Sequence, residues 1–331
     1  MSSVSFLEAK LQGRVRIVNS KKMKHLFMTI AMAAAFTACG HRASTDNAAE
    51  ADSTSVDSTN VTVAVDILRT DSIATEYSDS TAHVCVSAEW PVGGEKALVA
   101  SIRKYICEAL AIDVTTDEEH HVNYTDNGKQ LVSGLASKQF KDLSSMWHDA
   151  KKEGYGGDMA YEFLVRTWKL EETDTYITYM WTSEGFTGGA HGYFLATGTS
   201  FRKSDGKTFG YEMEYNRATE KHDVINQTMF KKSSSPQLYK IIKEGAKRYF
   251  KDCDVTITND EELADNLQVE DVNRIPLPSN PPYFTKDGLC FTYQQYEIAC
   301  YAVGLVSFTV PYAKIRPLLT EEAATLIPSS K

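Results

Sequence analysis

The most constraining feature of this 331-residue chain is a run of strand-like segments joined by short turns in its middle. Residues 161–170 and 176–186 flank a turn at 171–175, while 192–201 and 207–215 flank Ser204-Asp205-Gly206. Asp-Gly is a favoured hairpin dipeptide because both central positions tolerate positive φ. Strands that follow each other by hairpins, with few crossover helices between them, predict antiparallel sheets packed by helices on one face.

The flanking segments predict the remaining elements. Apolar residues at helical spacing predict a helix over 95–111, a second that ends before Gly154, and a third that opens at Ser233–Pro236. A short C-terminal helix is expected from Thr320, which is a good N-cap residue. Four further strands are predicted, at Val61–Leu68, Thr81–Trp90, Leu289–Tyr293 and Leu305–Val310. We therefore expect an α+β fold with two sub-domains, in which a few amphipathic helices pack on antiparallel sheets built from meanders and hairpins.

A short apolar segment, residues 26–38, precedes Cys39 and follows three lysines. Charge, an apolar stretch and small residues before the cysteine are the marks of a secretory signal, and the stretch is too short to span a bilayer. A cysteine after Thr37-Ala38 resembles the lipobox of bacterial lipoproteins, in which that thiol is acylated. Met23 is an ordinary start for such a signal, so residues 1–22 are interpreted as upstream translation. The residue after Cys39 is Gly40 and not Asp. By resemblance to the sorting signals of Gram-negative lipoproteins, this predicts the outer membrane, facing the periplasm.

The chain divides into a leader (1–38), a tether (39–60) and two folded parts (61–185 and 186–327). The tether is almost entirely small or polar, so it cannot bury enough apolar area to become ordered. The leader carries six basic side chains and one acid, which leaves a formal net charge of −14 on residues 39–331, against −9 for the whole chain. Such a surface repels nucleic acid and favours encounter with a basic protein, although solubility alone also explains it.

Several motifs in the second half point to a family. Phe186–Gly192 joins two predicted strands and contains Gly188-Gly189-Ala190-His191. It is followed by Asp205-Gly206-Lys207, and much later by Phe291–Ala299, Gly304 and Val310-Pro311-Tyr312. This ordered set resembles the DUF3298 domain, which is found in lysozyme-sensing anti-sigma factors of the RsiV type and in peptidoglycan deacetylases of the PdaC type. By order of elements, residues 61–185 resemble the DUF4163 module that usually precedes it.

The resemblance implies an extracytoplasmic sensing or binding role without the known effectors. The sequence shows neither the cytoplasmic sigma-binding segment of the anti-sigma factors nor the polysaccharide-deacetylase domain of the deacetylases. Its polar segment Phe209–Met229 is longer than the family usually has at this place. The partners that the resemblance suggests are a basic muramidase such as lysozyme, or peptidoglycan, with the membrane reached through Cys39.

The candidate ligand-binding residues are Gly189, His191, Tyr293, Tyr296 and Glu297. His191 lies among glycines, where the chain can approach another group closely, but its ring could equally tie the turn to a neighbouring strand. Tyr293, Tyr296 and Glu297 form an aromatic-acidic group, in which Glu297 could present an exposed anchor to a basic partner. Packing and bonding to backbone amides are the structural alternatives.

Sequence motifs for catalysis and for cofactors are absent. There is no G-x-S-x-G, H-E-x-x-H, C-x-x-C or P-loop, and the adjacent histidines of Glu118–His121 would point to opposite faces of a strand, so we expect no metal and no cofactor. Five cysteines besides Cys39 leave at least one unpaired, and a Cys290–Cys300 bridge is one option. Two hypotheses remain: a non-catalytic envelope lipoprotein that binds a protein or glycan, and a peptidoglycan- or acyl-directed hydrolase using His191 and Glu297.

Overall fold

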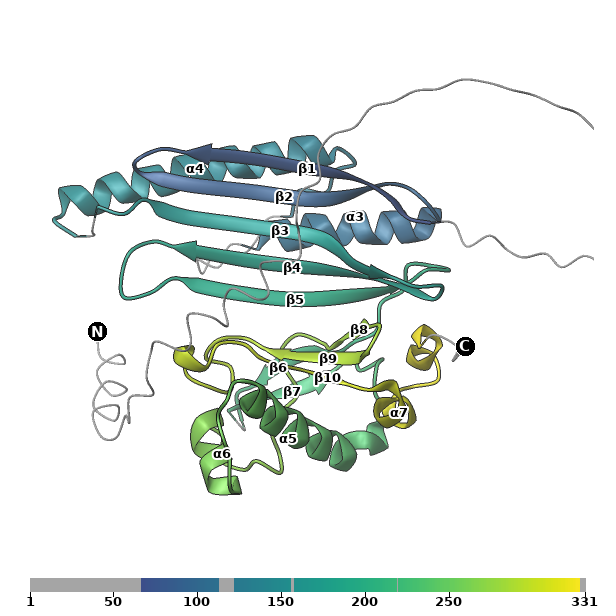
Figure 1. The fold of residues 1–331 in the computed structure, drawn as a ribbon. Coiled ribbons are helices and arrows are strands. Elements are labelled where there is room, and N and C mark those ends of the chain that lie inside the picture. Colours follow the sequence, from purple (N-terminus) through teal and green to yellow (C-terminus); the bar gives the residue numbers. More distant parts are fainter. Residues whose placement is uncertain (1–66, 113–121, 156–157, 219, 328–331) are drawn as a thin grey trace, which may run out of the picture. The chain divides into compact units, whose positions relative to one another are not determined.

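The computed structural model describes residues 67–112, 122–155, 158–218 and 220–327 (Figure 1). The predicted leader, Cys39, the tether and the Glu118–His121 run lie outside these ranges. Residues 63–331 form one compact unit. Its described part is an α+β fold with mostly antiparallel sheets, which confirms the predicted fold class.

A five-stranded sheet occupies the first half of this unit. Its strands follow each other in the order β1-β2-β3-β4-β5. All neighbours are antiparallel except β2 and β3, which run parallel because two helices form the crossover between them. The strands are β1 Arg69–Ser78, β2 Ala82–Gly93, β3 Tyr161–Glu172, β4 Tyr176–Phe186 and β5 Tyr193–Arg202.

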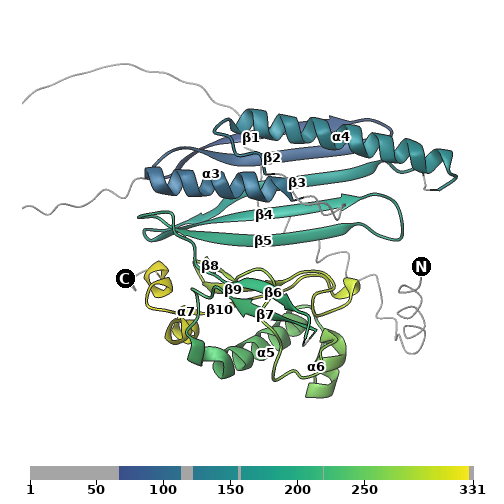
Figure 2. The same cartoon turned by 180° about the vertical axis from the view of Figure 1, so that it is seen from behind.

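The two crossover helices, α3 (Lys96–Ala111) and α4 (Gly128–Lys152), cover one face of this sheet (Figures 1 and 2). Both start at side-chain caps: Glu95 accepts from the Leu98 amide, and Asn127 accepts from the Gln130 amide. The apolar face of each helix packs against every second residue of the strands, because side chains of a strand point alternately to its two faces. The fully buried members include Leu98, Ile102, Ile106, Val132, Ala136, Val84, Val86 and Phe163.

A second core lies around a three-stranded sheet in the order β10-β9-β8. Helix α5 packs on it so closely that a Cβ at Gly245 would lie 2.2 Å from the Phe308 ring. The elements of this half are α5 Ser235–Asp252, α6 Asp260–Leu267, β8 Tyr283–Thr285, β9 Gly288–Tyr293, β10 Val306–Val310 and α7 Tyr312–Ile315, with 3-10 turns at Lys232–Ser234, Tyr301–Val303, Arg316–Leu318 and Ala323–Leu326.

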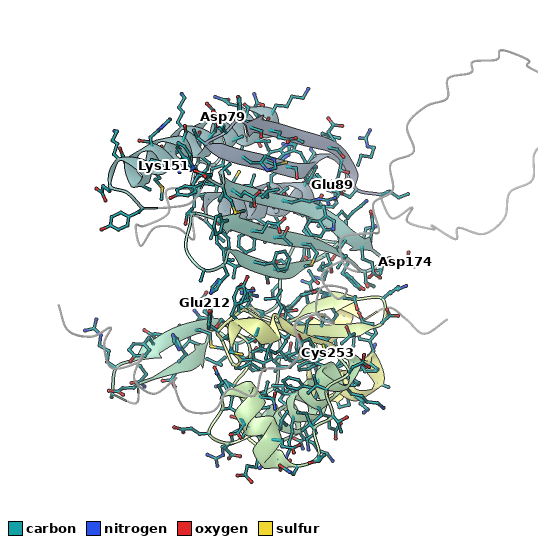
Figure 3. The ribbon with its side chains drawn as sticks, turned by 60° about the vertical axis from the view of Figure 1, so that its left-hand side comes forward. Asp79, Glu89, Lys151, Asp174, Glu212 and Cys253 are labelled. Atoms are coloured by element: carbon teal, nitrogen blue, oxygen red, sulfur yellow. The ribbon has the colours of Figure 1, made fainter. Side chains whose placement is uncertain are left out.

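A separate hairpin connects the two halves in sequence. It consists of β6 (Glu212–Asn216) and β7 (Lys221–Ile225), which pair only with each other. Figure 3 shows this hairpin extending outward, with Glu212 at its start. At its base the Thr228 amide donates to Gly210 O at 2.8 Å. It lies within the polar segment 209–229.

The two sheets meet along the edge of β5. The side-chain amide of Gln294 bonds both backbone groups of Ala196, accepting from N at 3.1 Å and donating to O at 2.8 Å. Gln295 accepts from the Phe194 amide at 3.1 Å. These two glutamines occupy the edge positions that a further strand would take, so β5 is not open to another strand.

Three local expectations need correction. Leu68, at the end of the expected strand Val61–Leu68, is not in a strand, and β1 begins one residue later. The sequence pattern did not predict β1, because most of its side chains are exposed and show no clear alternation. The expected strand 207–215 is confirmed only in part: residues 212–215 lie in β6, but that strand does not pair with β5, which is met only by an isolated bridge at Thr208, because Phe209 and Tyr211 are buried in the second core. The expected helix after Thr320 is only the short 3-10 turn Ala323–Leu326, whose N-cap is Glu322 and not Thr320; Thr320 Oγ1 still accepts from the Ala323 amide at 3.2 Å.

Candidate functional site

The β4–β5 loop and the segment after β9 bring two predicted site residues together. His191 lies in the first and Tyr296 in the second, 105 residues later. The Tyr296 hydroxyl lies 3.1 Å from His191 Nε2. The His191 ring also stacks on Tyr301, with centroids 3.8 Å apart and planes at 20°. We call these three side chains the aromatic cluster.

The hydrogen bonds of His191 indicate which tautomer its neutral ring adopts. Nδ1 lies 2.9 Å from Gly192 O, a group that only accepts, so Nδ1 carries the proton and donates. In the neutral ring, Nε2 is then the acceptor for the Tyr296 hydroxyl. The ring is therefore held at three points while it stays at the surface, and its partners lie in its own loop, in a turn and in a 3-10 turn rather than on a neighbouring strand.

The backbone around the cluster adopts unusual conformations. Gly188 and Gly189 have φ of 91° and 92°, which glycine tolerates and other residues rarely adopt. Tyr296 has φ of 64°, an outlier for a bulky residue, and its side chain is 63% exposed. Backbone held in such a region costs about 1–3 kcal/mol and tends to occur at functional sites. The fold thus maintains a strained, exposed tyrosine beside a histidine from a distant segment.

Glu297 has a structural role in this loop. One carboxylate oxygen accepts from both the amide and the hydroxyl of Ser279, and the other accepts from the Gln294 amide at 2.7 Å. Among the described side chains, no hydrogen bond joins Glu297 to His191. An acid–base pair made of these two residues is therefore not assembled, so the geometry does not favour the hydrolase hypothesis.

Tyr293 belongs to the core of the second half. It has no exposed surface, and its hydroxyl donates to Pro276 O at 2.6 Å. Burial raises the pKa of this phenol well above its ordinary value. A side chain without exposed surface cannot line a surface site, so Tyr293 is a core residue and not part of a ligand surface. The tyrosine that contacts His191 together with Tyr296 is instead Tyr301, which no sequence motif marks.

Acidic side chains lie on the helix-free face of the sheet at the same end. Glu184 pairs in register with Phe194, whose amide donates to Gln295, the neighbour of Tyr296. Partial desolvation, together with the charge of Glu162, raises the pKa of Glu184. Further along the same face, His83 Nε2 lies 3.1 Å from Glu76 Oε1. Glu162 and Glu184 therefore lie on β3 and β4 close to the end of β4, from which the loop with His191 departs.

A shallow hollow of about 530 Å³ lies at the opposite end of the five-stranded sheet. Its lining includes Trp90, the α4 start at Gly128, and Arg103, whose guanidinium lies 5.5 Å above the Trp90 ring and donates to Pro91 O. Because Arg103 also bonds Asp126, its main polar group is already engaged within the protein.

Other expected chemistry can be checked only where the structure describes it. Within the described ranges, no three His, Cys, Asp or Glu side chains gather as a metal site requires. Cys290 and Cys300 are both free thiols, so the optional bridge between them is not formed. No helix in the described part of the chain is long and apolar enough to cross a membrane.

Comparison with known proteins identifies part of the chain. Residues 227–313 match the model of DUF3298, described as a protein of unknown function. No curated protein matches the chain. A crystal structure of a DUF3298 family member from Bacteroides fragilis NCTC 9343 is 18% identical, with a TM-score of 0.59, over 79% of this chain and 97% of that one. One of a DUF3298 family protein from Pseudomonas aeruginosa PAO1 is 14% identical, with a TM-score of 0.52, over 80% and 99%.

These comparisons confirm a DUF3298 domain at residues 227–313, inside the predicted range 186–327, and they show a shared fold. The domain contains Tyr296 and Tyr301, whereas His191 lies before it, so the aromatic cluster joins the domain to the preceding sheet. The division at residue 185, the DUF4163 module and the lipoprotein leader stay predictions. β5, which follows that division, is part of the five-stranded sheet.

Proposed function

We propose that this protein is a non-catalytic binding lipoprotein of the cell envelope. In this proposal Cys39 carries the lipid, residues 39–60 form a tether, and the folded part works in the periplasm from the outer membrane. The leader motif and the composition of residues 40–60 support this setting. Mass spectrometry of the mature amino terminus tests it: an acylated Cys39 is expected, and an unmodified residue upstream of Cys39 would contradict it.

The ligand that we propose is a basic protein of the lysozyme type, bound at the aromatic cluster. The observation that carries this proposal is the exposed, strained Tyr296, held against His191 beside a surface that carries Glu184 and Glu162. Tyrosines supply large, rigid contact area, and neighbouring carboxylates steer a cationic partner. The formal charge of −14 on residues 39–331 favours the same encounter.

Binding of lysozyme to the full chain tests this proposal by calorimetry at low and at physiological salt. We expect binding that weakens as salt rises, because exposed charges are screened over about 8 Å at physiological ionic strength. Tyr296→Ala should raise the dissociation constant by at least about 25-fold, since an interface anchor contributes about 2 kcal/mol or more. Tyr215→Ala is the matched control, because Tyr215 is also an exposed tyrosine but lies on the β6–β7 hairpin.

Peptidoglycan is the other ligand that the family resemblance suggests, and the same variants separate the two. The site is a glycan site if purified sacculi bind the wild-type chain but not the Tyr296→Ala variant, while lysozyme binds neither. If neither probe binds at either salt concentration, the binding proposal fails for both ligands.

A further inference from the structure

The outer side of α5 carries exposed cations. Figures 1 and 2 show this helix on the side of the three-stranded sheet that faces away from the five-stranded sheet. Lys240, Arg248 and Lys251 lie within about 80° of one another around its axis, opposite its buried residues. All three are exposed. Arg248 donates to Thr309 O at 2.9 Å, and among the described side chains none of the three bonds a carboxylate.

Helix α7 adds a further cation to this surface. Lys314 Nζ lies 3.7 Å from Oε2 of Glu244, which is one helical turn after Lys240 on α5. The side chains of Lys314 and Glu244 are 59% and 50% exposed, so the pair is loose and well hydrated. We call Lys240, Arg248, Lys251 and Lys314 the basic face.

More cations continue the basic face at the start of α5. Lys231 Nζ donates to Pro317 O at 2.9 Å, which places Lys231 and Lys232 next to Arg316. These three side chains are exposed as well. Because the 18 residues of α5 span about 27 Å, the cations form an extended strip rather than a single point. Such a strip fits a broad anionic surface better than a small anion.

Other helix lysines of this protein are neutralised by acids. On α4, Lys138 and Lys152 each bond an aspartate, at 2.9 and 3.0 Å. On the flank of α5 that faces α6, Lys243 and Lys247 share the carboxylate of Asp260, at 2.6 and 3.0 Å. Acids are abundant, because residues 39–331 carry a formal charge of −14. A group of cations without acid partners on such a protein indicates an anionic partner outside the chain.

The proposed anchor selects a lipid surface as that partner. If Cys39 is acylated, only residues 40–66 separate the membrane from the described part of the chain. A tether of this length has a root-mean-square reach of about 30 Å, so the folded part stays close to the headgroups. Tethering makes the second contact intramolecular and so strengthens a weak surface interaction. Acidic side chains more than about 8 Å from the headgroups oppose it little, because salt screens them.

We propose that the basic face rests on anionic lipid headgroups of the membrane that holds the protein. Each lysine or arginine near such a surface strengthens binding about fivefold. The contact orients the folded part on the membrane and involves no residue of the aromatic cluster. It takes its setting from the proposed lipid anchor, but it does not depend on the proposed ligand.

Vesicle co-sedimentation tests the basic face without the acyl group. The protein is residues 39–331 with Cys39→Ser, which contains the whole compact unit 63–331. We expect binding at low salt to vesicles that contain about a quarter phosphatidylglycerol in phosphatidylcholine, and weaker binding as salt rises. Pure phosphatidylcholine vesicles should not bind. Equal binding to both kinds of vesicle, or no binding to the anionic ones, would overturn the proposal.

Charge reversal locates the contact. Lys240→Glu combined with Lys251→Glu should raise the lipid concentration for half-binding by at least about 25-fold, because two cations of about fivefold each are lost. Lys129→Glu combined with Lys141→Glu is the matched control. It changes the net charge equally at two exposed lysines of α4, which bond no carboxylate among the described side chains. Equal effects of the two pairs would show that net charge alone decides, and would refute the basic face.

The outcome can be separated from that of the proposed function. Circular dichroism establishes that each variant is folded, and calorimetry with lysozyme should give the same affinity for both pairs of lysine variants if the basic face is distinct from the ligand site. Vesicle binding that fails while Cys39 is found acylated would remove this inference alone. An unmodified amino terminus would remove the anchor without altering the vesicle result.

Discussion

Replacing Glu172 by glutamine should destabilise the protein more than any other single charge removal on β3. Glu172 lies at the end of this strand, with its side chain only 15% exposed. One carboxylate oxygen accepts from Lys203 Nζ at 2.7 Å and from the Leu68 amide at 3.2 Å. The other accepts from Lys169 Nζ at 2.8 Å. The carboxylate thus neutralises two ammonium groups and fixes the residue that precedes β1.

The size of the expected loss in the free energy of unfolding follows from the burial of Lys203. Its side chain is 9% exposed, so the Glu172→Gln variant leaves an ammonium group without a counter-charge and with little access to water. Removing one partner of a buried pair costs about 3–5 kcal/mol for this reason. Lys169 is 25% exposed and can recover hydration, so we expect a loss near the lower end, about 3 kcal/mol. For a folded unit of this size the melting temperature should fall by about 6–12 °C.

Urea unfolding followed by tryptophan fluorescence measures this loss. Glu322→Gln is the control, because the Glu322–Lys207 pair has the same distance of 2.7 Å but is well exposed, and exposed pairs contribute little to stability. Adding Lys203→Met to Glu172→Gln should restore part of the stability, because the uncompensated charge is removed. Equal, small losses for Glu172→Gln and Glu322→Gln would refute the reasoning.

Three further predictions concern stability. Burial raises the pKa of the Glu172 carboxyl, but its hydrogen bonds to Lys169, Lys203 and Leu68 outweigh this effect and hold the pKa below the ordinary 4.5. The stability that the ionised carboxylate contributes is therefore fully present above about pH 4.5 and is lost as the pH falls through the lower pKa of the folded state. In urea unfolding at a series of pH values, Glu172→Gln should lose less stability on acidification than the wild-type chain does. Gly245→Ala should cost about 1–3 kcal/mol in urea unfolding, because its Cβ would lie 2.2 Å from the Phe308 ring; no loss would contradict this packing. Gly134→Ala, in the interior of α4 with nothing within 4 Å, should instead stabilise by about 0.5–1 kcal/mol, and a lower melting temperature would contradict that.

The helices and the central strands were predictable because their periodicity is strong. The repeat that begins at Leu98 predicted α3 almost to its ends, and the alternation of Val84, Val86 and Ala88 predicted β2. Each pattern records a face that is buried against a neighbouring layer. The parallel pairing of β2 with β3 carried no such signal, because it depends on where two helices return the chain.

Elements with little buried surface could not be found in this way. β1 is an edge strand, and most of its side chains stay exposed, so its sequence shows no clear alternation. α6 spans only eight residues, too few for a helical repeat to stand out, although Asn259 was a usable N-cap signal. In β7 the described side chains, residues 222–225, include no buried one, and β8 has only three residues.

For the site, the sequence identified His191 and Tyr296 but not what they contact. Nothing local distinguishes Tyr301 from other tyrosines, because its stacking on His191 arises from a 3-10 turn in a distant segment. Tyr293 was selected with Tyr296 from one motif, yet every residue of β9 is buried, so Tyr293 points into the core. A central strand buried on both faces is a signal that could have separated the two tyrosines.

Hydrogen–deuterium exchange of the full chain, with and without saturating lysozyme, tests the proposed binding surface most directly. The account predicts slower amide exchange in the 188–192 loop and in residues 294–303, with little change in the β6–β7 hairpin. Protection confined to other segments, with unchanged exchange around His191 and Tyr296, would contradict a ligand site at the aromatic cluster.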